Sequence, residues 1–284
     1  MTDPRALLRR YLAQRLDLGE RQIALPSPVQ LESEPAAPPP SASPPGPSRE
    51  ARPRVPPAMP GGSAEGARKA RAKWTDELPP IPPMGIVIPA PTNDLFQSDP
   101  VAQAPFEEVV QRIHACKKCG LHAGRQHAVP GEGPTDARMV VVGEGPGATE
   151  DAQGRPFVGR AGELLNGILA AIDCPRETVY IANVVKCRPP DNRKPQGDEM
   201  EACLPYLHRQ LALIRPKVII AMGATAAEAL LQTRASLGQL RNKVHDYRGI
   251  PLVVTYHPAA LLRNPNWKRP TWDDVRIARQ LLDR

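Results

Sequence analysis

Three carboxylates lie within eight residues of one another, directly after a buried apolar run and inside a glycine-rich segment. The stretch 139–165 turns at Gly143 and then carries Glu144, Glu150 and Asp151. Carboxylates crowded in this way repel one another, and proteins keep such groups mainly where they serve a task. They can orient a water, transfer a proton or stabilise a developing positive charge. A turn that only connects a strand to a helix accounts for the glycines but not for the carboxylates.

Further polar side chains lie at the ends of predicted strands. Asn183 is near the end of one such strand, and His257 directly follows another. Parallel strands of an α/β fold bring their carboxyl ends to one edge, where such folds bind ligands. We therefore expect Glu144, Asn183 and His257 to meet in one cleft, near the isolated aromatic Phe157. The predicted strands cover 139–142, 178–185, 217–222 and 252–256, and the predicted helices cover 106–115, 198–214, 224–231 and 272–282.

The glycine turn also allows a dinucleotide-binding interpretation, which the spacing does not favour. After Gly143, Gly145 and Gly147 the next glycine is Gly154, so the string G-x-G-x-x-G is absent. We expect the next helix to start near Gly159, whereas a pyrophosphate site needs a helix directly behind the glycines.

Four of the five cysteines have a spacing typical of a metal centre. Cys116 and Cys119 form a C-x-x-C pair, Cys187 follows a predicted strand, and Cys203 lies in the first turns of a predicted helix. Four thiolates can hold zinc or an iron–sulfur cluster, and the wide separation of the last two favours a [4Fe–4S] cluster while leaving zinc as an alternative. Cys174 lies in an apolar context and is expected to be a core residue.

The motifs together resemble those of the family 4 uracil-DNA glycosylases of bacteria and archaea. They are, in order, GEGPG, E-D-x-x-G-R-P-F-V-G-R-A-G-x-L-L, N-V-V-K-C-R-P-P and H-P-x-x-L-L-R. The resemblance runs from Cys116 to the C-terminus. It implies an α/β domain of three layers, αβα, with a central, mostly parallel four-stranded sheet. It also implies a [4Fe–4S] cluster on the four cysteines named above, and hydrolysis of the N-glycosidic bond of deoxyuridine in DNA.

The resemblance further implies roles for the residues at the strand ends. An enzyme that acts on a base within DNA must flip it into a pocket. Phe157 would stack on the flipped uracil, and the Asn183 amide would donate to O4 and accept from N3–H. His257 would donate to O2, where negative charge accumulates as uracil departs. Backbone N–H groups around Gly145 would also contact the base.

The carboxylates and one apolar turn complete the implied site. Glu144 and Glu150 match the pocket carboxylates of the family, which would stabilise an oxocarbenium-like sugar and orient the attacking water. A better-known family of uracil glycosylases has an aspartate for water where this chain has Gly145, so the water-activating residue stays open, with Asp151 as a reserve candidate. A turn of three residues would enter the minor groove and fill the space left by the base: Leu261, Leu262 and Arg263.

Two other functions are weaker alternatives. A covalent uracil-binding relative would carry a basic, histidine-containing insertion after the cluster-bearing strand, and the segment 188–194 has no histidine. A non-enzymatic iron–sulfur module that only binds DNA would leave Phe157, Asn183 and His257 unexplained.

The first hundred residues differ in composition from the rest of the chain. They contain 21 of the 36 prolines, and we expect a disordered linker over 23–104 because so little apolar surface can be buried there. An amphipathic helix is predicted over 1–22, and the catalytic domain is assigned to 105–284. A short helix on a long tether suits docking to a replication or repair protein, with the sliding clamp as a specific hypothesis.

Charge and hydropathy narrow the class of protein. The formal net charge is +7. Residues 101–284 carry 25 lysines and arginines against 19 acidic side chains, which suits a polyanionic partner such as DNA. We find no transmembrane run and no signal-peptide core, and five cysteines fit a reducing compartment. We expect a cytoplasmic monomer without a membrane partner.

Overall fold

A single mixed sheet forms the centre of the molecule. The computed structural model describes residues 73–90 and 100–284. The six strands of the sheet lie in the order β1-β5-β6-β4-β2-β3, and every neighbouring pair is parallel except β5 and β6. Their bounds are β1 Met84–Ile88, β2 Met139–Gly143, β3 Tyr180–Asn183, β4 Val218–Met222, β5 Val244–Tyr247 and β6 Ile250–Thr255.

The central strands form from short runs of β-branched and other apolar residues. The run MVVVG of β2 and the run VIIAM of β4 are buried at every position. Continuous burial of this kind is typical of parallel strands that are covered on both faces. The sequence pattern therefore predicts that these two strands are interior, and in the structure each has a neighbouring strand on both sides.

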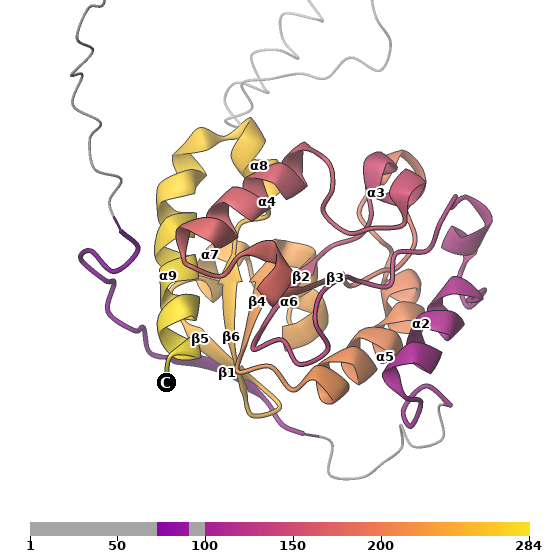
Figure 1. The fold of residues 1–284 in the computed structure, drawn as a ribbon, viewed down its shortest axis with the longest axis horizontal. Helices are drawn as coiled ribbons and strands as arrows, with labels where there is room; N and C mark the ends of the chain where they lie inside the picture. Colours follow the sequence, from indigo (N-terminus) through magenta and orange to yellow (C-terminus); the bar gives the residue numbers. More distant parts are fainter. Residues whose placement is uncertain (1–72, 91–99) are drawn as a thin grey trace, which may run out of the picture. The chain divides into compact units, whose positions relative to one another are not determined.

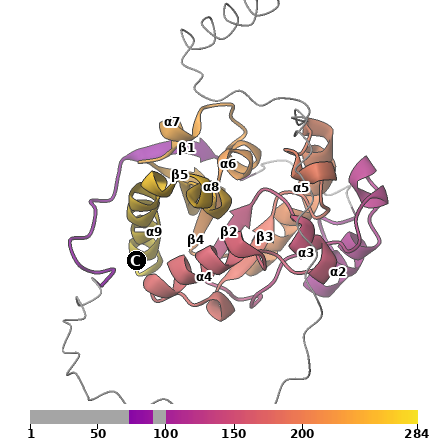
Figure 2. The same cartoon turned by 90° about the horizontal axis from the view of Figure 1, so that it is seen from above.

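Helices cover both faces of the sheet (Figures 1 and 2). One face packs against α2 (Phe106–His114), α5 (Gly197–Ile214) and α6 (Ala224–Leu231). The other face packs against α4 (Arg160–Ala171) and α9 (Lys268–Leu282). Three short helices lie among the connections: α3 (Ala148–Gln153), α7 (Leu237–Leu240) and α8 (Pro258–Arg263).

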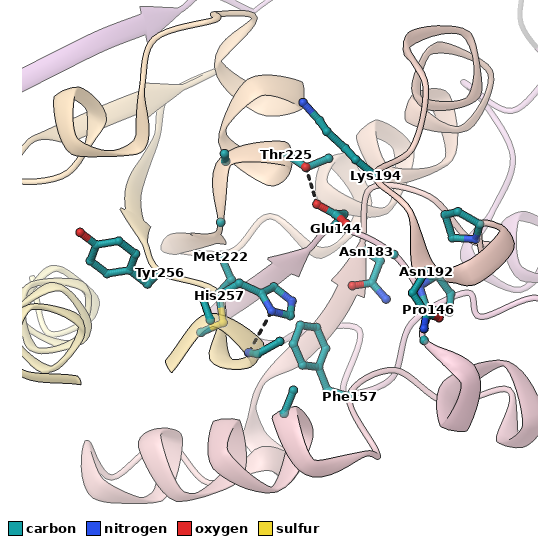
Figure 3. A pocket seen from close by; sticks show the side chains of 18 of the residues that line it. Glu144, Pro146, Phe157, Asn183, Asn192, Lys194, Met222, Thr225, Tyr256 and His257 are labelled. Atoms are coloured by element: carbon teal, nitrogen blue, oxygen red, sulfur yellow. Dashed lines mark hydrogen bonds between the residues drawn. The ribbon is translucent and has the colours of Figure 1, made fainter. Parts of the chain in front are cut away.

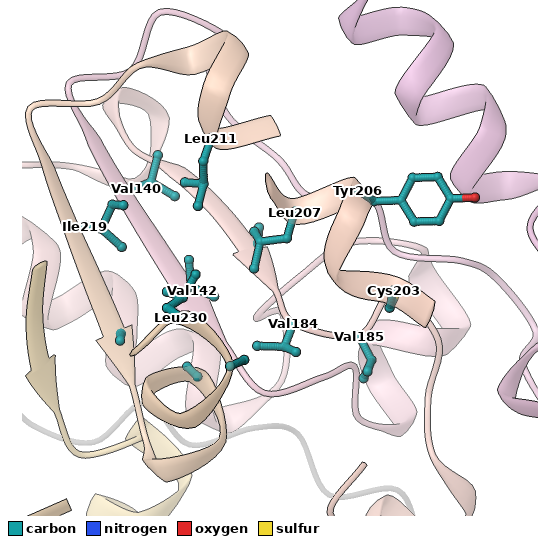
Figure 4. Packing of buried hydrophobic residues seen from close by; sticks show 14 of the residues in the cluster. Val140, Val142, Val184, Val185, Cys203, Tyr206, Leu207, Leu211, Ile219 and Leu230 are labelled. Atoms are coloured by element: carbon teal, nitrogen blue, oxygen red, sulfur yellow. The ribbon is translucent and has the colours of Figure 1, made fainter. Parts of the chain in front are cut away.

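Two apolar clusters hold the layers together. Figure 4 shows the first, in which Val140 and Val142 of β2 meet Leu207 and Leu211 of α5. In the second, the alternate β2 residues pack against α4 and α9. Burial of apolar surface on both sides of one strand stabilises the three-layer arrangement.

The predicted α/β fold class is confirmed, with two corrections. The sheet has six strands instead of four, because β1 and β5, which were not predicted, extend it beyond the predicted strand β6. The first helix after the glycine turn does not begin near Gly159, as predicted, but at Ala148, directly after Gly147, where α3 begins. Glu150 closes this helix start by accepting a hydrogen bond from the Gly147 N–H at 3.2 Å.

The predicted linker over 23–104 is wrong for its described part. Residues 73–88, which we call the N-terminal strap, run along α9 and end in β1, which pairs with β5 (Figure 1). The Trp74 indole donates to Asp173 at 2.6 Å, and Arg276 donates to two strap carbonyls. Val101 and Ala104 are also buried. The composition wrongly predicted disorder for this segment, because a few specific contacts suffice to anchor it.

Some predictions lie outside the described residues. The helix expected over 1–22 and most of the linker are among them, so the docking hypothesis stays a prediction. Within 73–90 and 100–284, every helix is too short or too polar to cross a bilayer.

Candidate active site

A cavity of about 800 Å³ opens at the carboxyl end of the sheet. Its walls include the residues that follow four parallel strands: Glu144 after β2, Asn183 at the end of β3, Gly223 after β4 and His257 after β6. The structure thus brings the three polar residues singled out in the sequence to one place. Figure 3 shows Phe157, Asn183 and His257 around a common space.

Phe157 is held in an unusual backbone conformation on one wall. Its φ is +50°, in the left-handed region that residues other than glycine rarely adopt. The ring stacks on His257, with centroids 5.3 Å apart and an interplanar angle of 29°. Two glycines lie against Phe157, and a side chain fits at neither. A Cβ at Gly143 would lie 2.5 Å from the Phe157 ring, and a Cβ at Gly162 would lie 1.9 Å from the Phe157 carbonyl oxygen.

Arg176 clamps the backbone that carries Phe157. Its guanidinium donates to the Phe157 carbonyl at 3.0 Å and to the Pro156 carbonyl at 2.6 Å. The same group contacts Asn166 and Glu132. Backbone strain persists only where the surroundings fix it from several sides, and this clamp supplies such a constraint.

Asn183 presents an unsatisfied polar group. The residue is 2% exposed, and its Oδ1 has no hydrogen-bond partner within the described part of the chain. A buried acceptor without a partner costs about 1–3 kcal/mol, so native proteins keep one mainly where a ligand completes it. The amide can accept one hydrogen bond and donate another, as recognition of a base edge requires.

His257 is a neutral hydrogen-bond donor in this cavity. Burial, helped by the nearby Arg263 and opposed by Glu150, lowers its pKa to about 4. Its Nδ1 accepts the Ala259 N–H at 3.2 Å, at the start of α8. The proton of the neutral ring is therefore on Nε2, which can donate to a ligand.

The two cavity carboxylates are held differently. Glu144 accepts one hydrogen bond, from the Thr225 hydroxyl at 2.5 Å. Glu150 accepts three from backbone, which come from Gly147 and, at 2.9 and 3.0 Å, from the N–H groups of Val158 and Gly159. Glu150 therefore orders the loop between α3 and α4 in addition to lining the cavity.

Asp151 does not fit the role of reserve candidate. It is 1% exposed and accepts the Gln126 N–H at 2.9 Å, so its carboxylate braces a distant loop. It is also absent from the cavity lining. Gly145 does line the cavity, and a Cβ there would lie 2.7 Å from the side chain of Val185.

The expected DNA-inserting turn folds as the helix α8. Leu262 is 41% exposed and Arg263 lines the cavity, but Leu261 is 1% exposed. Leu261 is buried and anchors the helix α8 to the domain, so the prediction that it enters DNA is wrong. One helical turn places neighbouring leucines on different sides, which the sequence string alone does not reveal.

The four spaced cysteines converge on a second, small cavity. Cys116, Cys119, Cys187 and Cys203 all line it, whereas Cys174 belongs to the core on the other face of the sheet. Arg125 donates to the Cys187 sulfur at 2.9 Å, and the Lys186 N–H donates to the Cys203 sulfur at 3.2 Å. Donors of this kind stabilise thiolate ligands.

The four convergent cysteines are a donor set that fits an iron–sulfur cluster. Among the described residues, no three His, Cys, Asp or Glu side chains lie close enough to hold one metal ion. A [4Fe–4S] cluster takes one thiolate at each iron and so spreads its ligands more widely. Burial raises the pKa of Cys203 to about 12, which means that the thiolate form needs a compensating positive charge.

Several residues of the site carry no signal in the sequence. Arg176 and Thr225 reach the site through contacts distant along the chain. Tyr256 and Trp267 also line the cavity. Only Tyr256 had a usable cue, because it stands next to His257.

Known proteins with similar sequences cover most of the domain. Residues 130–277 match the family model described as the uracil DNA glycosylase superfamily. The chain is 46% identical to a type-4 uracil-DNA glycosylase of Pyrobaculum aerophilum, over 56% of this chain and 86% of that protein. Identity is 44% with the type-4 enzyme of Thermotoga maritima, over 62% and 94% of the two chains. It is 43% with that of Sulfurisphaera tokodaii, over 62% and 84%.

Proposed function

The chain belongs to the uracil-DNA glycosylase superfamily, among the type-4 enzymes, and from this premise we propose how its site works. The protein is a DNA-repair hydrolase that removes uracil from DNA by cleaving the N-glycosidic bond. The observation that carries the proposal is the meeting of Phe157, Asn183 and His257 in one cavity.

Phe157 and Asn183 select the base. The Phe157 ring offers a stacking face for the flipped uracil. The unpaired Asn183 Oδ1 accepts from N3–H, and its amide nitrogen donates to O4. Cytosine reverses this pattern of donor and acceptor, so the same amide discriminates against it.

His257 stabilises the leaving group. As the bond breaks, negative charge gathers on uracil O2, and the Nε2–H of the neutral ring donates to it. The Ala259 N–H fixes this tautomer from the far side of the ring. A donor placed in advance at a developing anion lowers the barrier without reorganisation.

The carboxylates act on the sugar side. Both stabilise the oxocarbenium-like ring as uracil leaves. Glu150 is fixed by three backbone donors, which suits a purely electrostatic role. Glu144 has Oε2 held by Thr225, and we assign its other oxygen to the attacking water.

DNA contact and the cofactor complete the proposal. Leu262 fills the space left by the flipped base, and Arg263 accompanies it at the cavity. The four convergent cysteines hold a [4Fe–4S] cluster that cross-links three chain segments, a structural contribution when it is bound. We further propose a cytoplasmic monomer, with residues 1–22 as a docking helix, a linker over 23–72 and 91–99, and a catalytic domain over 105–284.

The test is release of uracil from a labelled oligonucleotide that contains one deoxyuridine. Wild-type protein should turn over and leave an abasic site that alkali cleaves. A stable protein–DNA adduct, or binding without release, would overturn the proposal in favour of a trap or a binding module.

Asn183→Asp is the variant that tests base recognition. An ionised carboxylate cannot donate to O4, so excision should fall about 10²–10³-fold, the usual loss for one oriented donor. Asn242→Asp makes the same chemical change at an exposed position outside the cavity and should keep the wild-type rate. Equal rates for the two variants would remove Asn183 from base recognition.

A further inference from the structure

The cavity extends beyond the part that would read uracil. Its volume of about 800 Å³ is in the range of sites for ligands much larger than one pyrimidine ring. Phe157, Asn183 and His257 surround one end. Tyr256 and Trp267 line another part of the wall, and Figure 3 shows the Tyr256 ring directed away from Phe157 and His257.

Tyr256 and Trp267 form a rigid aromatic stack. Their ring centroids are 4.8 Å apart and their planes differ by 3°. The Arg241 guanidinium lies 4.5 Å from the Tyr256 centroid. Arg241 is itself 9% exposed and held by Asp274 through two hydrogen bonds of 2.7 and 3.1 Å, so the stack rests on a fixed cation.

Trp267 is the exposed end of this stack. It is 36% exposed, although Tyr256 covers one face of its ring. It follows α8, which carries Leu262 and Arg263, and it directly precedes the exposed Lys268 and Arg269. An aromatic face among cations is the combination by which proteins bind unpaired nucleotides.

We propose that Trp267, backed by Tyr256 and Arg241, is a second stacking subsite of the enzyme. It takes the unpaired nucleobase of the nucleotide next to the deoxyuridine in the substrate strand. The inference rests on the proposed function, since the base-reading end of the cavity fixes where that neighbour lies. Stacking is tolerant of sequence because every base offers a flat face, so the subsite adds affinity for opened or single-stranded DNA without choosing a neighbouring base.

The test measures binding to single-stranded oligonucleotides that carry 2′-fluoro-deoxyuridine, a slowly cleaved analogue. One substrate has normal neighbours, and two others replace the 5′ or the 3′ neighbour by an abasic tetrahydrofuran. Trp267→Ala should weaken binding of the normal substrate about 5- to 150-fold, the range for loss of one base–aromatic stack. Trp267→Phe should restore most of it.

The decisive readout is the coupling between the protein and DNA changes. On one of the two abasic substrates, the wild-type protein should bind as weakly as Trp267→Ala binds the normal substrate. Trp267→Ala itself should bind this abasic substrate no more weakly than it binds the normal one. Trp74→Ala removes a tryptophan outside the cavity and should stay within twofold of wild type on every substrate. Additive losses, or unchanged binding by Trp267→Ala, would overturn the subsite.

A second measurement covers the case of a poorly folding variant. The chain has three tryptophans, so in the double variant Trp74→Phe/Trp272→Phe only Trp267 remains. Its fluorescence should be quenched by the normal substrate and not by the substrate with the relevant abasic neighbour. Quenching by both, or by neither, contradicts the proposal. Absence of uracil release by wild type would refute the proposed function itself, whereas release with an indifferent Trp267 refutes only the subsite.

Discussion

Replacement of Arg176 tests whether the strained Phe157 backbone is held in place from outside. Arg176→Ala removes the donors to the carbonyls of Pro156 and Phe157, which lie at 2.6 and 3.0 Å. Both of these residues are buried. A buried acceptor that loses its partner costs about 1–3 kcal/mol. Arg176 is 16% exposed, so water can reach part of the gap, and we expect a loss of about 2–4 kcal/mol in the free energy of unfolding.

The effect on catalysis should follow from the movement of Phe157. A φ of +50° stores about 1–3 kcal/mol of strain, which the chain can relax once the clamp is gone. Loss of one aromatic stack of about 1.4 kcal/mol corresponds to a tenfold effect. Uracil release at subsaturating DNA should therefore slow about tenfold. Urea denaturation and single-turnover release measure the two predictions separately.

Arg155→Ala is the matched control. Arg155 pairs with the same Glu132 carboxylate, at 2.8 Å through both nitrogens, but does not contact the Phe157 backbone and is 57% exposed. Exposed ion pairs contribute little, so both assays should stay close to wild type. Arg176→Lys keeps the charge without the fork and should recover only part of the loss. If Arg176→Ala behaves like Arg155→Ala in both assays, the clamp does not position Phe157.

Three further predictions concern the base site, the cofactor and the strap. His257→Ala should slow the chemical step about 10²–10³-fold. Because burial lowers the pKa of His257 to about 4, all of the folded protein carries the neutral donor above pH 6.5, and this donor is lost only as pH falls through about 4. An inflection of wild-type uracil release near pH 6.5 would contradict this assignment. Cys203→Ala should lose iron and the broad absorbance at about 400 nm, while Cys174→Ala should keep both. Metal analysis that finds one zinc and no iron would refute the cluster. Removal of residues 1–72 should leave stability and excision unchanged, whereas removal of 1–100 also strips the N-terminal strap and should lower the free energy of unfolding in urea.

The sequence predicted the parallel centre of the fold and the meeting of its polar strand ends. Continuous apolar runs mark β2 and β4 without ambiguity, and parallel topology then places Glu144, Asn183 and His257 on one edge. These are local signals combined with one general rule of topology.

The remaining features depend on contacts that no local pattern encodes. β1 was hidden by its proline-rich surroundings, and its partner β5 is a four-residue strand with alternating burial. The clamp by Arg176 acts over 19 residues of chain, and only the folded backbone brings its guanidinium to Phe157. The difference between Leu261 and Leu262 is a matter of which side of one helical turn faces the core. In each case tertiary packing decided what composition could not.

The position of β1 at the edge of the sheet has a consequence for synthesis on the ribosome. Met84 of β1 is paired with Val244 of β5, which is made 160 residues later. At about 5–20 residues per second, β1 waits about 8–32 seconds without its partner. During this time the segment MGIVI is an apolar strand free to pair with another nascent chain. Pro82 and Pro83 before it and Pro89 after it weaken the extension of such a pairing, since proline donates no backbone hydrogen bond. The prolines that conceal this strand in the sequence therefore also protect it until β5 emerges.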